Sequence, residues 1–535
     1  MKKNHIYLLL TVLTLITTSC ADYLDVNKNP NQATSVSADL ILPQAIVGSA
    51  SISSLYNFNY GAHFGGYIAN AGGFSGFGNL LNYNIVPGDY NFLWTNTYDN
   101  LEDYKIVLDQ TNAADDQSYL NATARIMTVL NYQRLVDAFG DIPYTEALKG
   151  NTNLSPKYDS APVIYQDLVS QLDQAITTIN TAKFPLKLTS SSDPLFSGDM
   201  NRWKQFANTL KLRILIRMSG VTALTPFVTT KFAALDRTIG FITTDAIVNP
   251  GYVKDRPNPS WNTFGYSAVG NLANSSRIPT QFAYGFYNNQ KIADAGRGSV
   301  IFKNYGLTGA SATPINQLGN ETNAPPIITN FSTWYTGVYN SATSIGNSLG
   351  VLKGPSQGQV LILAAESSFL QAEAQVRGFL TGDPAINFEK GIVDSFTYLY
   401  SDVTNTLGAG KNVAADVAKY KTEGATDNNN SARYTVNFAL ATTTTQKLEA
   451  IITQKYIAVN MINSDEGWNE YRRTGFPRSI AAGNGFTNIA SNKSNSPRPD
   501  KLPTRILYPS SEQSYNAANY RAINQFADLI FWDPN

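Results

Sequence analysis

Apolar side chains recur every three or four residues along several long segments of this 535-residue chain, and this spacing restricts the fold more than any other feature. In one segment Trp94, Tyr98 and Leu101 would share one face of an α-helix, because their spacing matches the helical repeat. The segments span 94–108, 122–130, 164–179, 203–218, 361–377 and 448–462. They predict a mainly α fold in which each helix buries one apolar stripe against its neighbours.

Two other long segments, 57–93 and 250–350, lack such a period and are rich in glycine, asparagine and aromatic residues. Loops of this length in a compact protein are usually functional or disordered, and their aromatic content argues against disorder. Successive helical pairs would stack like tetratricopeptide units, with each pair burying its stripe against the next. We therefore expect a helical scaffold with long irregular loops packed on one side.

The first 19 residues have the layout of a secretory signal peptide. Lys2 and Lys3 precede an apolar stretch, Ile6 to Ile16, which is followed by small residues and Cys20. This stretch has 11 residues, whereas a membrane-spanning helix needs about 20. We expect residues 1–19 to be removed and residues 20–535 to form a single domain that begins with a short tether.

Cys20 is the only cysteine in the chain, so it can form neither an internal disulfide nor a thiolate metal site with other cysteines. It stands where a lipoprotein signal peptidase would cut, and we expect its thiol to carry a lipid. Two or more acyl chains anchor a protein stably, because each buried methylene contributes about 0.8 kcal/mol. The alternative is an ordinary signal peptide that happens to be followed by a cysteine.

Positive and negative side chains balance at 40 each, and charged residues make up only 15% of the chain. Without a basic excess, the sequence offers no electrostatic basis for nucleic-acid binding. Aromatic residues reach 12%, and the polar surface must come mainly from hydroxyl and amide side chains. Such a surface suits an uncharged polar ligand.

The chain offers few residues for catalysis. His63 is the only histidine outside the signal peptide, and no G-x-S-x-G turn accompanies it. One histidine and one lipidated cysteine cannot build an ordinary zinc site, so we expect no catalytic residue, metal or cofactor. Glu366 and Glu373 share a helical face, and a glycosidase uses paired carboxylates. Because Arg377 lies four residues after Glu373 and can pair with it, we interpret these charges as structural.

Aromatic residues in the two irregular segments are the remaining candidates for a binding site. A flat ring offers an apolar face to a sugar, while nearby polar groups can bond to its hydroxyls. For any one of these rings, burial in the core is the alternative. The predicted ligand-binding residues are Phe74, Phe77, Trp261, Tyr266, Trp334 and Tyr335. We expect Trp261 and Trp334 to be the stacking platforms, because tryptophan has the largest apolar face.

Several sequence motifs are spread over the mature chain. They include Asp22-Tyr23-Leu24-Asp25, Phe139-Gly140-Asp141-Ile142-Pro143-Tyr144, Arg202-Trp203-Lys204-Gln205-Phe206, Glu466-Gly467-Trp468-Asn469-Glu470-Tyr471 and Arg505-Ile506-Leu507-Tyr508-Pro509. Together they resemble the SusD/RagB family of outer-membrane lipoproteins, in particular its SusD-like branch. The resemblance implies about four tetratricopeptide-like helical pairs and a lipid anchor in the outer membrane, facing the cell exterior. It also implies a SusC-like, TonB-dependent transporter as partner, above which a glycan or another nutrient is captured.

The function expected from these features is non-catalytic capture of a nutrient, most of all a glycan or oligosaccharide. One alternative is a surface-anchored hydrolase. The scarcity of histidine weighs against an esterase, but a glycosidase that uses only carboxylates passes that test. Another alternative is an adaptor that uses its helical pairs to hold protein partners.

Replacing Cys20 by alanine should release the protein from membranes or leave its precursor uncleaved, because the acyl chains supply the membrane affinity. Membrane fractionation and labelling with a lipid precursor test this expectation. A Ser19→Ala variant, which keeps the thiol, is the control. Unchanged fractionation of Cys20→Ala together with an unchanged mass after labelling would contradict lipidation at this residue.

Overall fold

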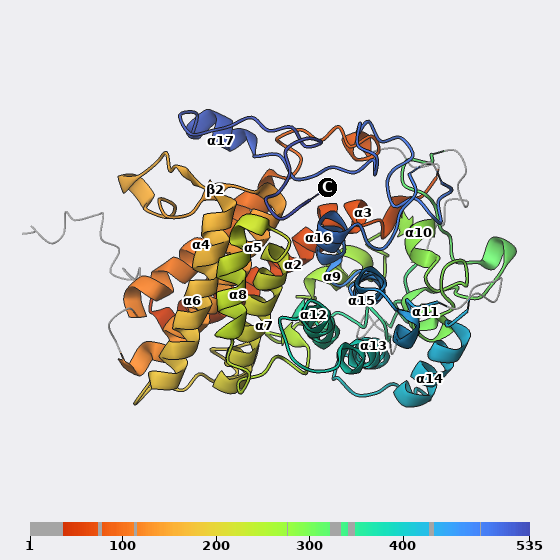
Figure 1. The fold of residues 1–535 in the computed structure, drawn as a ribbon, viewed down its shortest axis with the longest axis horizontal. Helices are drawn as coiled ribbons and strands as arrows, with labels where there is room; N and C mark the ends of the chain where they lie inside the picture. The colour runs from red at the N-terminus through yellow and green to blue at the C-terminus, as the bar shows by residue number, and fades with distance from the viewer. Residues whose placement is uncertain are drawn as a thin grey trace, which may run out of the picture.

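The computed structural model describes residues 36–72, 77–111, 115–274, 276–321, 333–340, 348–426, 433–481 and 483–534. The fold is mainly helical, as the apolar stripes predict (Figure 1). The longer helices are α2 (Ala38–Tyr56), α4 (Asn91–Thr111), α5 (Ser118–Phe139), α6 (Ala161–Thr181), α7 (Met200–Met218), α12 (Ala364–Val376), α13 (Pro384–Tyr400), α14 (Val413–Glu423), α15 (Thr444–Ala458) and α16 (Ser464–Thr474). The signal peptide and Cys20 lie outside the described residues.

The long helices form a continuous series in which each one packs against the next (Figure 1). Helix α2 lies against α4, α4 against α5, α5 against α6, and α6 against α7. Helix α7 then contacts α12, which also packs on α13 and α15. Stacking of this kind buries the apolar stripe of each helix between its neighbours, so the core runs through the whole series.

Four of the predicted helical stripes lie on α4, α5, α6 and α7, and the structure confirms them. Helix α5 ends where the sequence indicates, because Gly140 takes a positive φ of 79° just after Phe139. A Cβ atom at Gly140 would lie only 2.7 Å from the guanidinium of Arg505. Both the backbone conformation and the close approach of this arginine therefore require glycine.

The segment 361–377 begins as a strand, and the prediction of a helix from Leu361 is wrong for its first residues. Strand β6 (Gln359–Ile362) pairs antiparallel with β4 (Ala246–Val248). Helix α12 starts after it, at Ala364, whose backbone N–H donates to the carboxylate of Asp245 at 2.8 Å. The pairing with β4 is a long-range interaction, so helical spacing along the segment could not reveal it.

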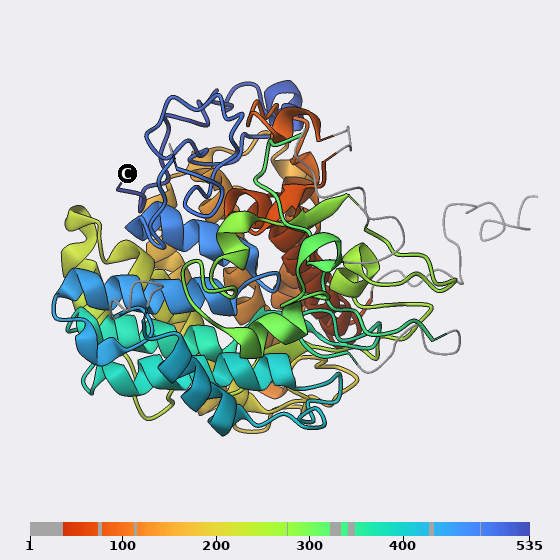
Figure 2. The same ribbon diagram turned by 90° about the vertical axis from the view of Figure 1, so that its right-hand side faces the viewer.

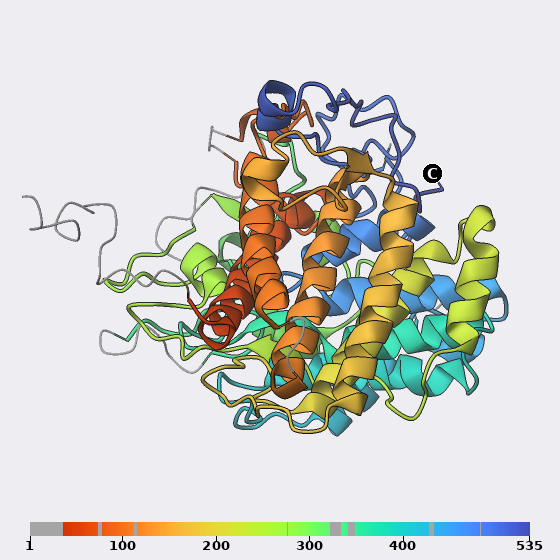
Figure 3. The same cartoon turned by 90° about the vertical axis from the view of Figure 1, so that its left-hand side faces the viewer.

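The two segments predicted to be irregular contain short helices and strands that fix their course. Residues 57–64 continue α2 as a π-helical turn (Asn57–Gly61) and α3 (Ala62–Phe64). Strand β1 (Ile68–Asn70) pairs antiparallel with β5 (Arg277–Pro279), which joins the two segments. Outside these segments, β2 (Ile142–Pro143) pairs antiparallel with β3 (Tyr158–Asp159). The other short helices are α8 (Thr225–Ala233), α9 (Pro259–Phe264), α10 (Gln281–Tyr284), α11 (Ala295–Ile301) and α17 (Ser510–Tyr515). Figures 2 and 3 show the green loops between β4 and β6 gathered on one side of the molecule.

The run Ala38–Phe64 is long and apolar enough to cross a membrane by composition alone. Half of the most apolar stretch of this run is buried inside the protein. Helix α2, which makes up most of the run, packs against α4 and α5. These contacts make α2 a core helix of the scaffold.

Ion pairs link α5, α7, α12, α15 and α16 in the interior, and we call these residues the buried ion network. Each side chain in it is at most 6% exposed. Lys455 Nζ lies 2.8 Å from Glu470 and 3.5 Å from Glu366. Burial alone would raise the pKa of Glu470, but the neighbouring Arg473 and Lys455 outweigh it and lower the pKa to about 2. The members are Asp137, Arg213, Arg217, Glu366, Glu373, Lys455, Glu466, Glu470 and Arg473.

Glu373 has two arginine partners in this network. Arg377 Nε donates to it at 2.8 Å, which confirms the predicted pair, and Arg473 donates to both carboxylate oxygens at 2.7 Å. The parallel bonds of Arg473 form the fork geometry that favours arginine over lysine. The structural interpretation of these charges is therefore confirmed by the geometry.

Replacing Glu373 by alanine should lower the free energy of unfolding by about 3–5 kcal/mol, because it removes a partner from a buried arginine. Urea titration of the mature protein measures this loss. The control is Glu423→Ala, which breaks an i,i+4 pair with Lys419 whose side chains are 48% and 62% exposed, and it should cost at most about 0.5 kcal/mol. Equal stabilities of the two variants would contradict the network's role.

Candidate functional site

Helix α9 carries two aromatic rings, of which Trp261 packs on Tyr266, and Phe264 packs on rings from two distant segments. Pro259 opens the helix, and the Asn258 side chain caps it by accepting the backbone N–H of Trp261 at 3.0 Å. The Trp261 indole N–H donates to the carbonyl of Tyr266 at 3.0 Å, which folds the chain back over the helix. A Cβ atom at Gly265 would lie 2.4 Å from the Trp261 ring, so this turn requires glycine.

The rings around α9 form what we call the loop aromatic cluster. Phe264 lies 4.7 Å from Phe58 and 5.1 Å from Trp334 between ring centroids. Tyr266 lies 6.3 Å from Trp261 and 5.5 Å from Tyr339. These spacings and tilts are those that aromatic pairs prefer. The cluster consists of Phe58, Trp261, Phe264, Tyr266, Trp334 and Tyr339.

The two tryptophans expected to be stacking platforms are core residues. Trp261 is 1% exposed and Trp334 is 0% exposed, so neither ring offers a free face and the expectation that they are exposed is wrong. Both belong to the hydrophobic core, where Trp261 packs on Tyr266 and Trp334 on Phe264. Tyr266 and Tyr339 are only partly buried and form the outer layer. The accessible aromatic rings of the cluster are therefore these tyrosines, and not the tryptophans that the sequence suggested.

Trp334 and Tyr335, which the sequence grouped together, point to different places. Trp334 bridges to Phe302, and the backbone N–H of Tyr335 donates to the carbonyl of Ile301 at 2.8 Å. In such an extended segment successive side chains point to opposite faces. Tyr335 consequently lines a separate cavity of about 510 Å³, together with residues of α11 and the loop around Lys411.

Phe77 and Phe74 come from the first irregular segment. Phe77 is partly buried and packs on the core beside the short turn Gly78–Leu80. In the part of the chain that the structure describes, no ring contact joins Phe77 to the loop aromatic cluster. Phe74 lies outside the described residues. The structure thus brings Trp261, Tyr266 and Trp334 together and leaves Phe77 and Tyr335 apart from them.

The two loop segments that carry most rings of the loop aromatic cluster contain no charged side chain. No aspartate, glutamate, lysine or arginine occurs in residues 258–272 or 333–340. The Tyr339 hydroxyl donates to the carbonyl of Ala268 at 3.2 Å and ties the two segments together. Exposed Asn262 and Asn271 add amide groups at the rim, and Val269 is 77% exposed. Rings with adjacent amides and no formal charge suit a neutral, hydroxyl-rich ligand.

The residues that could have catalysed hydrolysis, two glutamates and one histidine, are buried. Glu366 is 0% exposed and Glu373 is 1% exposed, and both lie in the buried ion network. A glycosidase needs two carboxyl groups that flank an accessible glycosidic bond. Burial, and to a lesser degree Arg277, lowers the pKa of His63 to about 3. This histidine is therefore neutral at physiological pH, and its Nδ1 lies 3.1 Å from the carbonyl of Asn59.

Comparisons with known proteins agree with the fold. The SusD-like family model, described as "Starch-binding associating with outer membrane", matches residues 30–509. The chain is similar to a chitin-binding SusD homologue from Flavobacterium johnsoniae, with 21% identity, a TM-score of 0.66, and coverage of 92% of this chain and 99% of that one. A SusD/RagB family protein from Bacteroides thetaiotaomicron shares 17% identity with a TM-score of 0.69, covering 93% and 99%. At these identities the structures establish the fold alone. No curated protein matches the chain by sequence.

Replacing Trp261 or Trp334 by alanine should lower the free energy of unfolding by about 3–5 kcal/mol, because each change leaves a large cavity in the core. Tyr339→Ala should cost much less, since its ring is partly exposed and forms the outer layer. Thermal and urea unfolding of the three variants provide the comparison. Full stability of Trp261→Ala and Trp334→Ala would show that the tryptophans are not core residues.

Proposed function

Because this chain belongs to the SusD-like family, we propose that it is a non-catalytic lipoprotein of the outer membrane that captures a glycan and delivers it to a SusC-like, TonB-dependent transporter. The observation that carries the proposal is the contact of two partly exposed tyrosines, Tyr266 and Tyr339, on loop segments that contain no charged side chain. A neutral oligosaccharide can stack on its tyrosine rings and bond to its amides, and no buried charge has to be left unpaired.

Within this proposal Tyr266 and Tyr339 are the stacking residues. Trp261 supports Tyr266 through their ring contact and through the indole bond to the Tyr266 carbonyl. Trp334 packs on Phe264, which also belongs to α9. Tyr335, Phe77 and Phe74 remain proposed ligand contacts at other places on the loops. A site on loops that a rigid scaffold positions is the common arrangement for binding proteins.

The proposed anchor gives the domain freedom to stand above a membrane partner. Once residues 1–19 are removed, residues 20–535 form one domain attached through the lipid on Cys20. Residues 21–37 separate that cysteine from α2, and a segment of this length can extend to about 60 Å at most. This reach would let the domain stand above a transporter in the same membrane.

The alternatives draw less support from the described residues. A surface hydrolase would need accessible carboxylates or a usable histidine, and Glu366, Glu373 and His63 are all buried. An adaptor that binds proteins through its helical pairs would not need an uncharged aromatic surface on the loop side. Glycan capture accounts for that surface directly.

Tyr266→Ala and Tyr339→Ala should each weaken glycan binding by about 2- to 12-fold, which corresponds to the ~0.5–1.5 kcal/mol of an aromatic contact. Isothermal titration calorimetry would use malto-oligosaccharides and chito-oligosaccharides, since the family description names starch and a similar structure is a chitin-binding protein. Tyr515→Ala is the matched control, because that ring is 82% exposed on α17.

Unchanged affinities in both loop variants, with normal melting temperatures, would argue against the tyrosine site. Product analysis after long incubation of each glycan with the wild-type protein tests the non-catalytic part of the proposal. Shortened oligosaccharides would favour the hydrolase alternative.

A further inference from the structure

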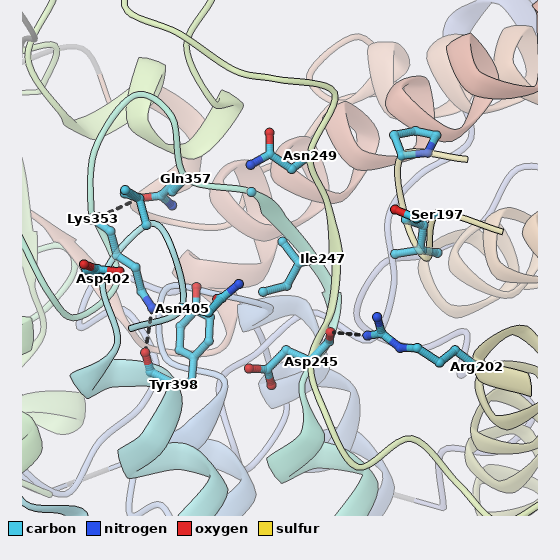
Figure 4. A pocket seen from close by; sticks show the side chains of 14 residues that line it. Ser197, Arg202, Asp245, Ile247, Asn249, Lys353, Gln357, Tyr398, Asp402 and Asn405 are labelled. Carbon is cyan, nitrogen blue, oxygen red and sulfur yellow. Dashed lines mark hydrogen bonds between the residues drawn. The ribbon is translucent and has the colours of Figure 1, made fainter. Parts of the chain in front are cut away.

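A cavity lined mainly by polar side chains lies between α7, the β4–β6 pair and the end of α13, and we call it the polar cavity (Figure 4). It consists of two adjoining hollows of about 280 Å³ and 360 Å³. Small-molecule sites usually measure about 300–1,000 Å³, so each hollow fits a small ligand only. Both hollows are lined by Arg202, Asp245, Ile247, Tyr398 and Asn405.

Asp245 presents one carboxylate oxygen to the polar cavity without a protein donor. Its Oδ1 accepts the backbone N–H of Ala364 at the start of α12, at 2.8 Å. Among the described residues no group donates to Oδ2 and no cation lies within ion-pair distance. Burial raises the pKa of Asp245 to about 6, so the carboxylate is still largely charged at neutral pH. Asp245 is only partly buried, so this oxygen is open to a hydrogen-bond donor from a ligand.

Two cations face the same cavity, and in the described part of the chain neither has a carboxylate within ion-pair distance, although Asp245 and Asp402 attract Lys353 from further away. The Lys353 side chain is 4% exposed, and its Nζ donates to the carbonyl of Tyr398 at 2.6 Å. The guanidinium of Arg202 donates to the Thr244 hydroxyl at 3.1 Å and lies over the ring of Phe196. Both groups retain N–H donors for an acceptor in the cavity. Figure 4 shows Asp245 between them, with Tyr398 and Asn405 beside it.

The polar cavity therefore combines the carboxylate of Asp245, with Asp402 and Asp394 also in its lining, with donors of positive charge and neutral amides. A sugar hydroxyl donates and accepts at once, so one sugar ring can satisfy both kinds of group. A charged ligand of either sign would lie close to a lining group that carries the same charge and repels it. We propose that the polar cavity is a second ligand site, which binds a single neutral sugar unit.

This site is separate from the loop aromatic cluster, and none of the cluster's rings lines it. Its chemistry also differs, because it would bind hydroxyls through hydrogen bonds to charged groups, whereas the cluster offers partly exposed rings. A site of this size would take a free monosaccharide or one terminal unit of a longer chain. The proposal does not depend on stacking at Tyr266.

The test is ligand-observed NMR of the mature protein with D-glucose, D-galactose and N-acetyl-D-glucosamine, each alone. Asp245→Asn keeps the acceptor for Ala364 but removes the charge, and Arg202→Met removes the guanidinium. Each change should weaken the affinity for the sugar by about tenfold or more, the usual effect of losing a hydrogen bond to a charged group. Lys419→Met, on the exposed face of α14, is the control and should have no effect.

Tyr266→Ala separates this site from the loop site, because monosaccharide binding should survive in that variant. Melting temperatures show whether each variant is folded. If Asp245→Asn disturbs α12, sugar binding by Arg202→Met becomes the test of the polar cavity. The proposal is overturned if none of the three sugars binds, or if binding is unchanged in both cavity variants. Loss of monosaccharide binding in Tyr266→Ala alone would also overturn it, and would place the sugar at the loop site.

Discussion

The buried ion network is the constraint on which the rest of the structure depends. It joins α5, α7 and α12 with the consecutive helices α15 and α16 at one place in the interior. Burying so many charges is costly, and such pairs often contribute little net stability compared with an apolar core. Their geometry is demanding, because a slipped helix would leave a charge unpaired. We infer that the network fixes the register of the helices against one another.

Both proposed sites are attached to helices of this network. Helix α16 packs against the turn Asn57–Gly61, and a Cβ atom at Gly61 would lie 2.5 Å from the backbone of Asp465. That turn carries Phe58 into the loop aromatic cluster. On the other side, α12 begins at the polar cavity, where Asp245 caps it. Strand β6 links the two, because Gln359 accepts hydrogen bonds from Asn258 and Ser260 at the start of α9.

The sequence predicts the scaffold far better than the site. The stripes on α4 to α7 follow from local periodicity, and the Glu373–Arg377 pair follows from i,i+4 spacing, so both are confirmed. Trp261 and Trp334 are both core residues, packed on Tyr266 and Phe264 respectively, and no local pattern reveals which ring ends up outside. The polar cavity is assembled from α7, β4, α13 and the loops that precede β6 and follow α13, so spacing gives no sign of it. A usable signal is the complete lack of charge in 258–272 and 333–340.

The central claim is that the uncharged loop surface, held by the helical scaffold, captures the glycan. Hydrogen exchange of the mature protein, with and without its tightest-binding neutral oligosaccharide, tests it most directly, because protection is read out segment by segment. The account predicts slower exchange in residues 265–272 and 335–340, with α4, α5 and α6 unchanged. Protection confined to those helices, with none in the loops, would contradict it.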